Sequence, residues 1–229
     1  GEAVVREELS RTAKLLGESA VNSLEQKKIA VFGLGGVGGH AAEALVRTGI
    51  GAIDIVDGDT VALSNINRQL AALHSTVGKN KTDVCAERFL DINPEIKLRK
   101  FTLFLSEETI GNFDFSEYDY VLDCIDDIPA KVLLASVCER LGVRLISSMG
   151  AGNKLNPMGF KVADIYETSV CPLARAMRAR LRKAGVGRLR VVYSTEEPVI
   201  TERVPASCAY VPSAAGLLMA SVVIDELTR

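Results

Sequence analysis

Hydrophobic positions in the first two thirds of the chain fall into short apolar runs separated by stretches of helical spacing. Leucine and alanine recur at helical spacing between residues 6 and 24, which predicts an amphipathic helix ahead of the core. The runs that follow are rich in valine and isoleucine and predict strands at 29–32, 52–56, 97–103, 120–124 and 143–148, with helices at 41–48, 79–92 and 127–141. Strands that alternate with helices indicate a parallel sheet covered on both faces.

The pattern loosens beyond Gly150. Strands are predicted at 160–165 and 189–193, and helices at 172–183 and from about residue 212 onward. Neither an internal repeat nor a low-complexity linker interrupts the chain, so residues 1–229 are interpreted as a single domain with a nucleotide-binding core at about 11–150 and a smaller, substrate-facing α+β portion at about 151–229. The predicted fold class is α/β, a doubly wound and mostly parallel sheet of the Rossmann-like kind.

Composition narrows the possible functions. Hydrophobic residues make up 48% and charged residues 24%, as in an ordinary globular protein. The aromatic share is 5% without tryptophan, which argues against a base-stacking platform for single strands. The five cysteines form no CxxC pair, which excludes a zinc knuckle and fits a reducing, cytoplasmic location. The apolar run at 214–224 is too short to predict a membrane span.

A glycine-rich motif follows the first predicted core strand. The run GLGGVG at 33–38 fits GxGxxG and precedes a predicted helix. Glycines let the backbone approach phosphate oxygens, and Asp57, at the end of the next strand, can hold ribose hydroxyls. This motif alone fits NAD and ATP equally well. Its candidate nucleotide-binding glycines are Gly33, Gly35, Gly36 and Gly38.

The residues after Asp57 favour ATP over a nicotinamide cofactor. The stretch from Asn65 through Arg68 to Gln69, then Lys81 at the start of a helix and Asp126 past the fourth strand, provides two cations and one carboxylate. A triphosphate needs cations to neutralise its charge and a carboxylate to hold Mg²⁺. We therefore predict ATP and Mg²⁺ as cofactors, and an NAD-dependent oxidoreductase would leave these residues unexplained.

In combination, these motifs resemble the adenylation domain of ubiquitin-activating-like enzymes, the ThiF/MoeB superfamily. They are GLGGVG, VDGD at 56–59, NINRQ at 65–69, Lys81 within GKNKTD, and LDCIDD at 122–127. The resemblance implies that Asp57 binds the ribose, that Asn65, Arg68 and Lys81 bind the phosphates, and that Asp126 holds the magnesium. It also implies a homodimer in which Arg11 reaches the partner's ATP, with Arg6 or Lys14 as alternatives.

The second half of the chain resembles the tRNA threonylcarbamoyladenosine dehydratases of this superfamily. The segments concerned are SSMGAGNK at 147–154, TSVCPL at 168–173, VVYS at 191–194 and VPSAAG at 211–216. The resemblance implies a tRNA substrate whose threonyl carboxylate is adenylated and then cyclised with loss of water. The alternative is an adenylyltransferase that activates a ubiquitin-like sulfur carrier, with Cys171 or Cys208 as thiol acceptor, and a sulfur-transfer partner remains open.

A basic stretch agrees with a polyanionic partner. Between Glu167 and Glu196 no acidic residue occurs, although the net charge of the chain is −2. Such a confined stretch on an acidic protein predicts a docking surface for tRNA, while a solvated helix face or a dimer contact remains the alternative. The candidate tRNA-binding residues are Arg175, Arg178, Arg180, Arg182, Lys183, Arg188 and Arg190.

Overall fold

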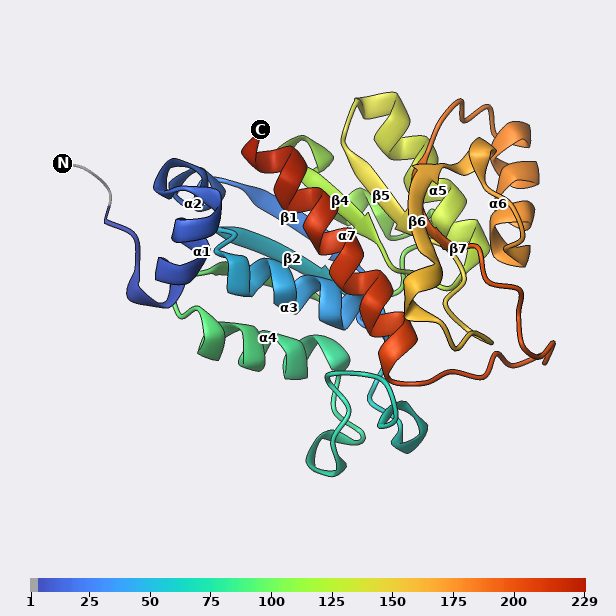
Figure 1. Cartoon of the computed structure of the whole chain (residues 1–229), viewed down its shortest axis with the longest axis horizontal. Coiled ribbons are helices and arrows are strands. Elements are labelled where there is room, and N and C mark those ends of the chain that lie inside the picture. Colours follow the sequence, from blue (N-terminus) through green and yellow to red (C-terminus); the bar gives the residue numbers. More distant parts are fainter. Residues whose placement is uncertain (1–3) are drawn as a thin grey trace.

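A single seven-stranded sheet forms the centre of the protein, seen here in a computed structural model that describes residues 4–229 (Figure 1). The strand order is β3-β2-β1-β4-β5-β7-β6, and only β6 runs antiparallel, against β7. This confirms the predicted doubly wound, mostly parallel sheet. The strands are β1 Lys28–Phe32, β2 Ala52–Val56, β3 Lys97–Phe101, β4 Tyr120–Asp123, β5 Leu145–Ser148, β6 Phe160–Asp164 and β7 Arg190–Ser194.

Helices cover both faces of the sheet because the strand residues alternate between two apolar clusters. Ile29 and Val31 of β1 pack with α3 (Gly38–Thr48), α4 (Lys81–Ile92) and α7 (Tyr210–Thr228). Ala30 and Phe32 point the other way, into a cluster that includes α5 (Ile128–Leu141). The helix α6 (Pro172–Lys183) packs beside α5 on that second face (Figure 1).

Local signals set the ends of two crossover helices. The carboxylate of Asp127 accepts a hydrogen bond from the backbone amide of Ala130 and so caps the start of α5, where Pro129 occupies the first turn. Gly49 ends α3 in the left-handed conformation with a φ of 102°. Both ends agree with the boundaries that the sequence predicts.

The N-terminal helix is broken, which corrects the prediction of one helix over residues 6–24. The structure has α1 (Ser10–Leu16) and α2 (Glu18–Leu24), separated at Gly17, whose φ of 94° is incompatible with a continuing helix. Apolar positions keep helical spacing on both sides of the glycine, so the break leaves no trace in the hydrophobic pattern.

The C-terminal third extends the same sheet. β7 pairs in parallel with β5, and β6 adds one antiparallel strand at the edge. The chain then returns to the first face as α7, which lies across α3 (Figure 1). Residues 151–229 therefore complete the sheet of the nucleotide-binding core.

The terminal helix α7 is longer than the apolar run at 214–224 suggests. It has 19 residues and a mean hydropathy of 1.4, so by length and composition alone it is able to cross a membrane. Half of the most apolar 18-residue stretch of this helix is buried within the protein. A β-carbon on Gly216 would lie 2.3 Å from the carbonyl oxygen of Val37, so the two helices are in close backbone contact. These contacts are those of a helix in the core of this fold.

Candidate active site

A cavity of about 620 Å³ lies beyond the carboxyl ends of the central parallel strands. Ligands of doubly wound sheets bind at this edge, where the strand order reverses between β1 and β4. The walls come from the connections that leave these strands, and from two segments further along the chain. The main lining segments are 33–37 without Leu34, 56–59, 103–105, 124–126, 148–154, 171–173 and 204–207 without Ala206.

The glycine-rich turn forms the floor of the cavity. Gly33 has a φ of 95°, and a β-carbon there would lie 2.4 Å from the carbonyl oxygen of Cys124. Gly33, Gly35 and Gly36 line the cavity, and their contact with a nucleotide stays a prediction. Gly38 does not line it, because it begins α3 so close to the turn that a β-carbon would lie 1.7 Å from the carbonyl oxygen of Gly33. Its absent side chain allows the turn and helix to pack, and the N-terminus of α3 favours anionic groups.

Asp57 connects the end of β2 to this turn. One carboxylate oxygen accepts a hydrogen bond from the backbone amide of Leu34 at 2.8 Å, and the other accepts one from the amide of Asp59 at 2.8 Å. Each oxygen retains acceptor capacity, and Asp57 lines the cavity. The arrangement suits a ribose hydroxyl donor, and this role remains a prediction.

Two cations approach the turn from the same side. Arg68 is half-buried and its Nη1 donates to the Ser64 carbonyl oxygen at 3.1 Å and to Asn67 Oδ1 at 2.9 Å, which fixes the guanidinium at the cavity wall. Lys81 is 6% exposed, and its Nζ lies 4.0 Å from Asp59 Oδ2. Burying a cation against so distant a carboxylate is costly, which favours an anionic ligand beside it.

Asn65 is engaged within its own loop, and its phosphate contact stays a prediction. It does not line the cavity, because its Oδ1 accepts a hydrogen bond from the backbone amide of Ala62 and closes the turn of the 3-10 helix Leu63–Asn65. Its neighbour Gln69 does line the cavity. Gln69 Oε1 is buried without a hydrogen-bond partner among the described residues, so this amide is available to a ligand.

Asp126 lies on the loop that follows β4, with an exposed carboxylate at the cavity. No hydrogen bond or ion pair engages this side chain within the described residues. Residues 4–229 also contain no group of three or more His, Cys, Asp or Glu that could hold a metal unaided. Mg²⁺ in nucleotide sites takes one or two carboxylates and completes its shell with phosphate oxygens and water. Asp126 fits that requirement.

A buried network beneath the cavity holds the Asp126 loop in place. Asp123 Oδ1 accepts a hydrogen bond from the backbone amide of Ile125 at 3.0 Å. Its Oδ2 accepts hydrogen bonds from Lys131 Nζ at 3.1 Å and from Ser147 Oγ at 2.8 Å. Asp123 and Lys131 are both fully buried, and their ion pair joins β4 to α5, while the Ser147 hydrogen bond adds β5.

Several cavity residues were not predicted from the sequence. Phe104 is 63% exposed and its ring lies over Gly58, where a β-carbon would be 2.6 Å from the ring, so it offers a flat apolar wall on the side of Asp57. Lys154 is buried in the opposite wall. Phe104 lies in a connection without periodicity or a motif of its own. Lys154 ends the segment SSMGAGNK at 147–154, but the sequence assigns no role to this lysine.

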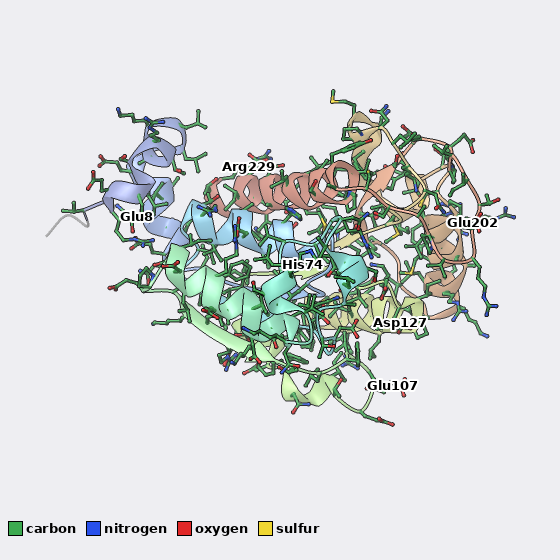
Figure 2. The ribbon with its side chains drawn as sticks, turned by 90° about the horizontal axis from the view of Figure 1, so that it is seen from below. Glu8, His74, Glu107, Asp127, Glu202 and Arg229 are labelled. Carbon is green, nitrogen blue, oxygen red and sulfur yellow. The ribbon has the colours of Figure 1, made fainter. Side chains whose placement is uncertain are left out.

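Arg11 lies far from the cavity of its own chain. It is exposed on α1, which packs at the end of the molecule opposite the cavity. Figure 2 shows Glu8, just before α1, at one end, and Asp127, next to Asp126, toward the other. Arg11 can therefore act at a nucleotide only from a partner subunit, and this role remains a prediction.

The predicted basic surface divides into two groups. Arg178 Nη1 donates to Thr168 Oγ1 at 2.6 Å, and Arg190 forms an ion pair with Glu226, so both residues serve contacts within the chain. The predicted tRNA contact of all seven residues stays a prediction. Arg182 remains exposed, with its guanidinium 5.0 Å from the centre of the Tyr166 ring. The other exposed cations are Arg175, Arg180, Lys183, Arg188 and the ion-paired Arg190.

The cysteines are reduced and mostly buried. All five are free thiols. Burial raises the pKa of Cys85 and of Cys138 to about 12, and it also raises the pKa of Cys124. Cys171 lines the cavity but is only 1% exposed, which disfavours it as a thiol acceptor for a protein substrate. Cys208 is partly exposed.

Known proteins resemble the chain over nearly its full length. The model of the ThiF family matches residues 9–228. The tRNA threonylcarbamoyladenosine dehydratase of Bacillus subtilis is 39% identical, over 97% of this chain and 95% of its own length. Crystal structures of the Escherichia coli enzyme of the same name, in complex with AMP and with ATP, superpose with TM-scores of 0.92 and 0.91 at 34% identity. These alignments cover 99% and 98% of this chain and 97% of each crystal chain.

The agreement extends over the whole sheet. The family match covers every strand of the sheet and all of the described chain except residues 4–8 and Arg229. The chain therefore belongs to the ThiF family.

Proposed function

We propose that this protein is an ATP-dependent tRNA threonylcarbamoyladenosine dehydratase that works in the cytoplasm. Similarity over 97% of this chain and 95% of the Bacillus subtilis enzyme supports the proposal, because it includes the second half of the chain as well as the nucleotide motifs. The observation that carries it is the cavity itself. One continuous space has a phosphate-binding turn with Arg68 and Lys81 on one side, and room for a second reactant beside β5 on the other.

The reaction follows from a carboxylate and ATP meeting in this space. A carboxylate oxygen of the threonyl group attacks the α-phosphorus of ATP, the bond to the bridging oxygen breaks, and pyrophosphate leaves. The carbamoyl group of the same nucleoside then attacks the activated carbonyl carbon and expels AMP, for a net loss of one water from the nucleoside. Both groups belong to one molecule, so proximity replaces a protein nucleophile.

The protein's own groups would stabilise charge on the phosphates. Arg68 and Lys81 are preorganised, the first by hydrogen bonds to its own loop and the second by burial. Gly35, Gly36 and the start of α3 present backbone beside the same phosphates. Asp126 would hold Mg²⁺, which supplies positive charge to the phosphate oxygens when bound. Phe104 would stack on the adenine, and Asp57 would hold the ribose.

Further partners belong to the same proposal. The exposed cations of α6 would contact the tRNA backbone, because Pro172 and Leu173 at the start of this helix line the cavity. A homodimer would bring Arg11 of one subunit to the ATP of the other. A sulfur-transfer protein would be a further partner.

The test incubates the protein with ATP, magnesium and threonylcarbamoylated tRNA, and measures the modified nucleoside by mass spectrometry. The wild-type protein should yield a nucleoside lighter by one water, together with AMP and pyrophosphate. Asp126→Asn should lose this turnover while its unfolding temperature is unchanged. Asp127→Asn is the matched control, because an asparagine still caps α5 and turnover should persist. Full turnover by Asp126→Asn, or no lighter nucleoside from wild type, would contradict the proposal.

A further inference from the structure

Lys154 is the one buried lysine of the described chain that lacks a carboxylate partner. The three buried lysines are Lys81, Lys131 and Lys154, with exposed fractions of 6%, 0% and 5%. Lys81 has Asp59 at 4.0 Å, and Lys131 has Asp123 at 3.1 Å. Within residues 4–229 no acidic side chain forms an ion pair with Lys154. An ammonium group buried without an anion is costly to the fold, so a counterion from outside the chain would stabilise it.

The ammonium group is fixed at the cavity wall by main-chain contacts. Its Nζ donates to the carbonyl oxygens of Gly150 at 3.0 Å and Gly152 at 3.2 Å. An ammonium has three donors, so one remains for a ligand. Nζ lies 3.7 Å from the position of a β-carbon on Gly150, and both residues line the cavity. Lys154 is therefore a preorganised cation with a free donor.

The segment that covers Lys154 is also held in place. Asn153, just before the lysine, has a left-handed φ of 61°. Its backbone amide and Oδ1 both bond to Ala206, at 2.8 Å each, and its carbonyl oxygen accepts from the amide of Val199 at 2.7 Å. These bonds draw Pro198, Val204 and Pro205 over this end of the cavity, where they form an apolar wall. The segment that carries Lys154 is therefore fixed beside an apolar wall.

The position of Lys154 separates it from the phosphate-binding groups. Lys154 follows β5, whereas Asp57 and Lys81 belong to the β2 side of the cavity. β5 is two strands from β1 and three strands from β2, which corresponds to about 10 Å and about 14 Å at the usual strand spacing. Nucleotide and second reactant must occupy different sides of the α-phosphate for attack to occur. Lys154 is on the side of the second reactant.

We infer that Lys154 binds the carboxylate of the substrate that is to be adenylated, and orients it toward the α-phosphate. The inference rests on the proposed function and adds the group that recognises the second reactant. Its chemistry is a single ammonium donor to one carboxylate oxygen, which leaves the other oxygen free as nucleophile. Lys154 would therefore distinguish a free carboxylate from a neutral ester.

The experiment compares two anticodon stem-loop RNAs, one with the threonylcarbamoyl carboxylic acid and one with its methyl ester. Binding to the full-length protein, loaded with a non-hydrolysable ATP analogue, is measured by calorimetry. The wild-type protein should bind the acid about ten- to a hundredfold more tightly than the ester. Lys154→Gln should bind both RNAs equally, Lys154→Arg should keep part of the preference, and affinity for the ATP analogue should stay unchanged. Lys161→Gln, which removes an exposed lysine of β6, should retain the full preference.

Three results would overturn the inference. One is equal affinity of the wild-type protein for acid and ester, which tests it even if Lys154→Gln fails to fold. Another is an undiminished preference of Lys154→Gln for the acid over the ester, which is expected if Lys154 only holds the Gly150–Gly152 turn in place. The third is a parallel loss of affinity for the ATP analogue, which would assign Lys154 to the phosphates. Failure of the proposed function gives a different result from failure of this inference. In that case the wild-type protein would form no dehydrated nucleoside from ATP and tRNA.

Discussion

The ion pair between Asp123 and Lys131 supports the loop that carries Asp126, and its removal gives a sharp test of the site. Both side chains are fully buried with Nζ and Oδ2 3.1 Å apart. Removing one partner of a buried pair costs about 3–5 kcal/mol, because the other charge stays buried without compensation. In Lys131→Met the carboxylate keeps its bonds from Ser147 Oγ and from the amide of Ile125. We therefore expect a loss near the lower value, about 3 kcal/mol of unfolding free energy.

A double-mutant cycle separates the pair from its surroundings. Asp123→Leu leaves the buried ammonium of Lys131 without an acceptor and also frees the Ile125 amide, so its loss should be at the upper value, about 5 kcal/mol. The double variant Asp123→Leu/Lys131→Met removes both charges and should cost at least about 2 kcal/mol less than the sum of the single variants.

The assay is urea unfolding followed by circular dichroism, with unfolding free energies from linear extrapolation. Lys161→Met, at an exposed position of β6, should stay within about 0.5 kcal/mol of wild type. Losses that add within about 0.5 kcal/mol would refute the reasoning, because they would show that the two charges do not stabilise each other.

Three further predictions follow from contacts described above. Gly38→Ala should weaken ATP binding at least about tenfold in calorimetry, because its β-carbon would lie 1.7 Å from the Gly33 carbonyl oxygen, whereas Gly111→Ala, with no atom within 4 Å, should bind normally. Burial raises the pKa of Cys85 to about 12, against 9.0 in the unfolded chain, and this adds stability that is present below pH 9 and lost as the pH rises toward 12. Cys85→Ala should therefore flatten the decline of the unfolding free energy between pH 9 and pH 12. Parallel curves for the variant and the wild type would contradict this. The third prediction concerns the triple variant in which alanine replaces Arg175, Arg180 and Lys183. It should weaken tRNA binding in filter binding and reduce the slope of log affinity against log salt concentration by about 3, at about 0.9 per phosphate contact. An unchanged slope would place the tRNA elsewhere.

The parts of the fold and site that sequence could predict are those set by local rules. Gly33 and Asp57 sit at fixed offsets from buried strands, and parallel strands end at one edge, so motif spacing placed them at one cavity with Lys81 and Asp126. The strand and helix boundaries followed equally local signals, such as Pro129 at the start of α5.

Other features depend on contacts that the hydrophobic pattern does not encode. The sequence does not show the ion pair that Arg190 forms with Glu226 of α7, or the hydrogen bond by which Asn65 closes its own turn. Lys154 and Phe104 reach the cavity through the order of the strands, which no local pattern encodes. Gly17 breaks a helix whose apolar spacing is uninterrupted.

The helix α6 connects the cavity wall to a row of exposed cations and so fixes the distance between them. Its first residues, Pro172 and Leu173, form part of the cavity wall, and its exposed cations continue to Lys183. At 1.5 Å per residue, the span from Leu173 to Lys183 is about 15 Å. Under the proposed function, an RNA whose phosphates bind along this helix can place in the cavity only a nucleotide that lies at a fixed distance from those phosphates. Selection of one adenosine among many would then depend on geometry along the strand, with no need to read neighbouring bases.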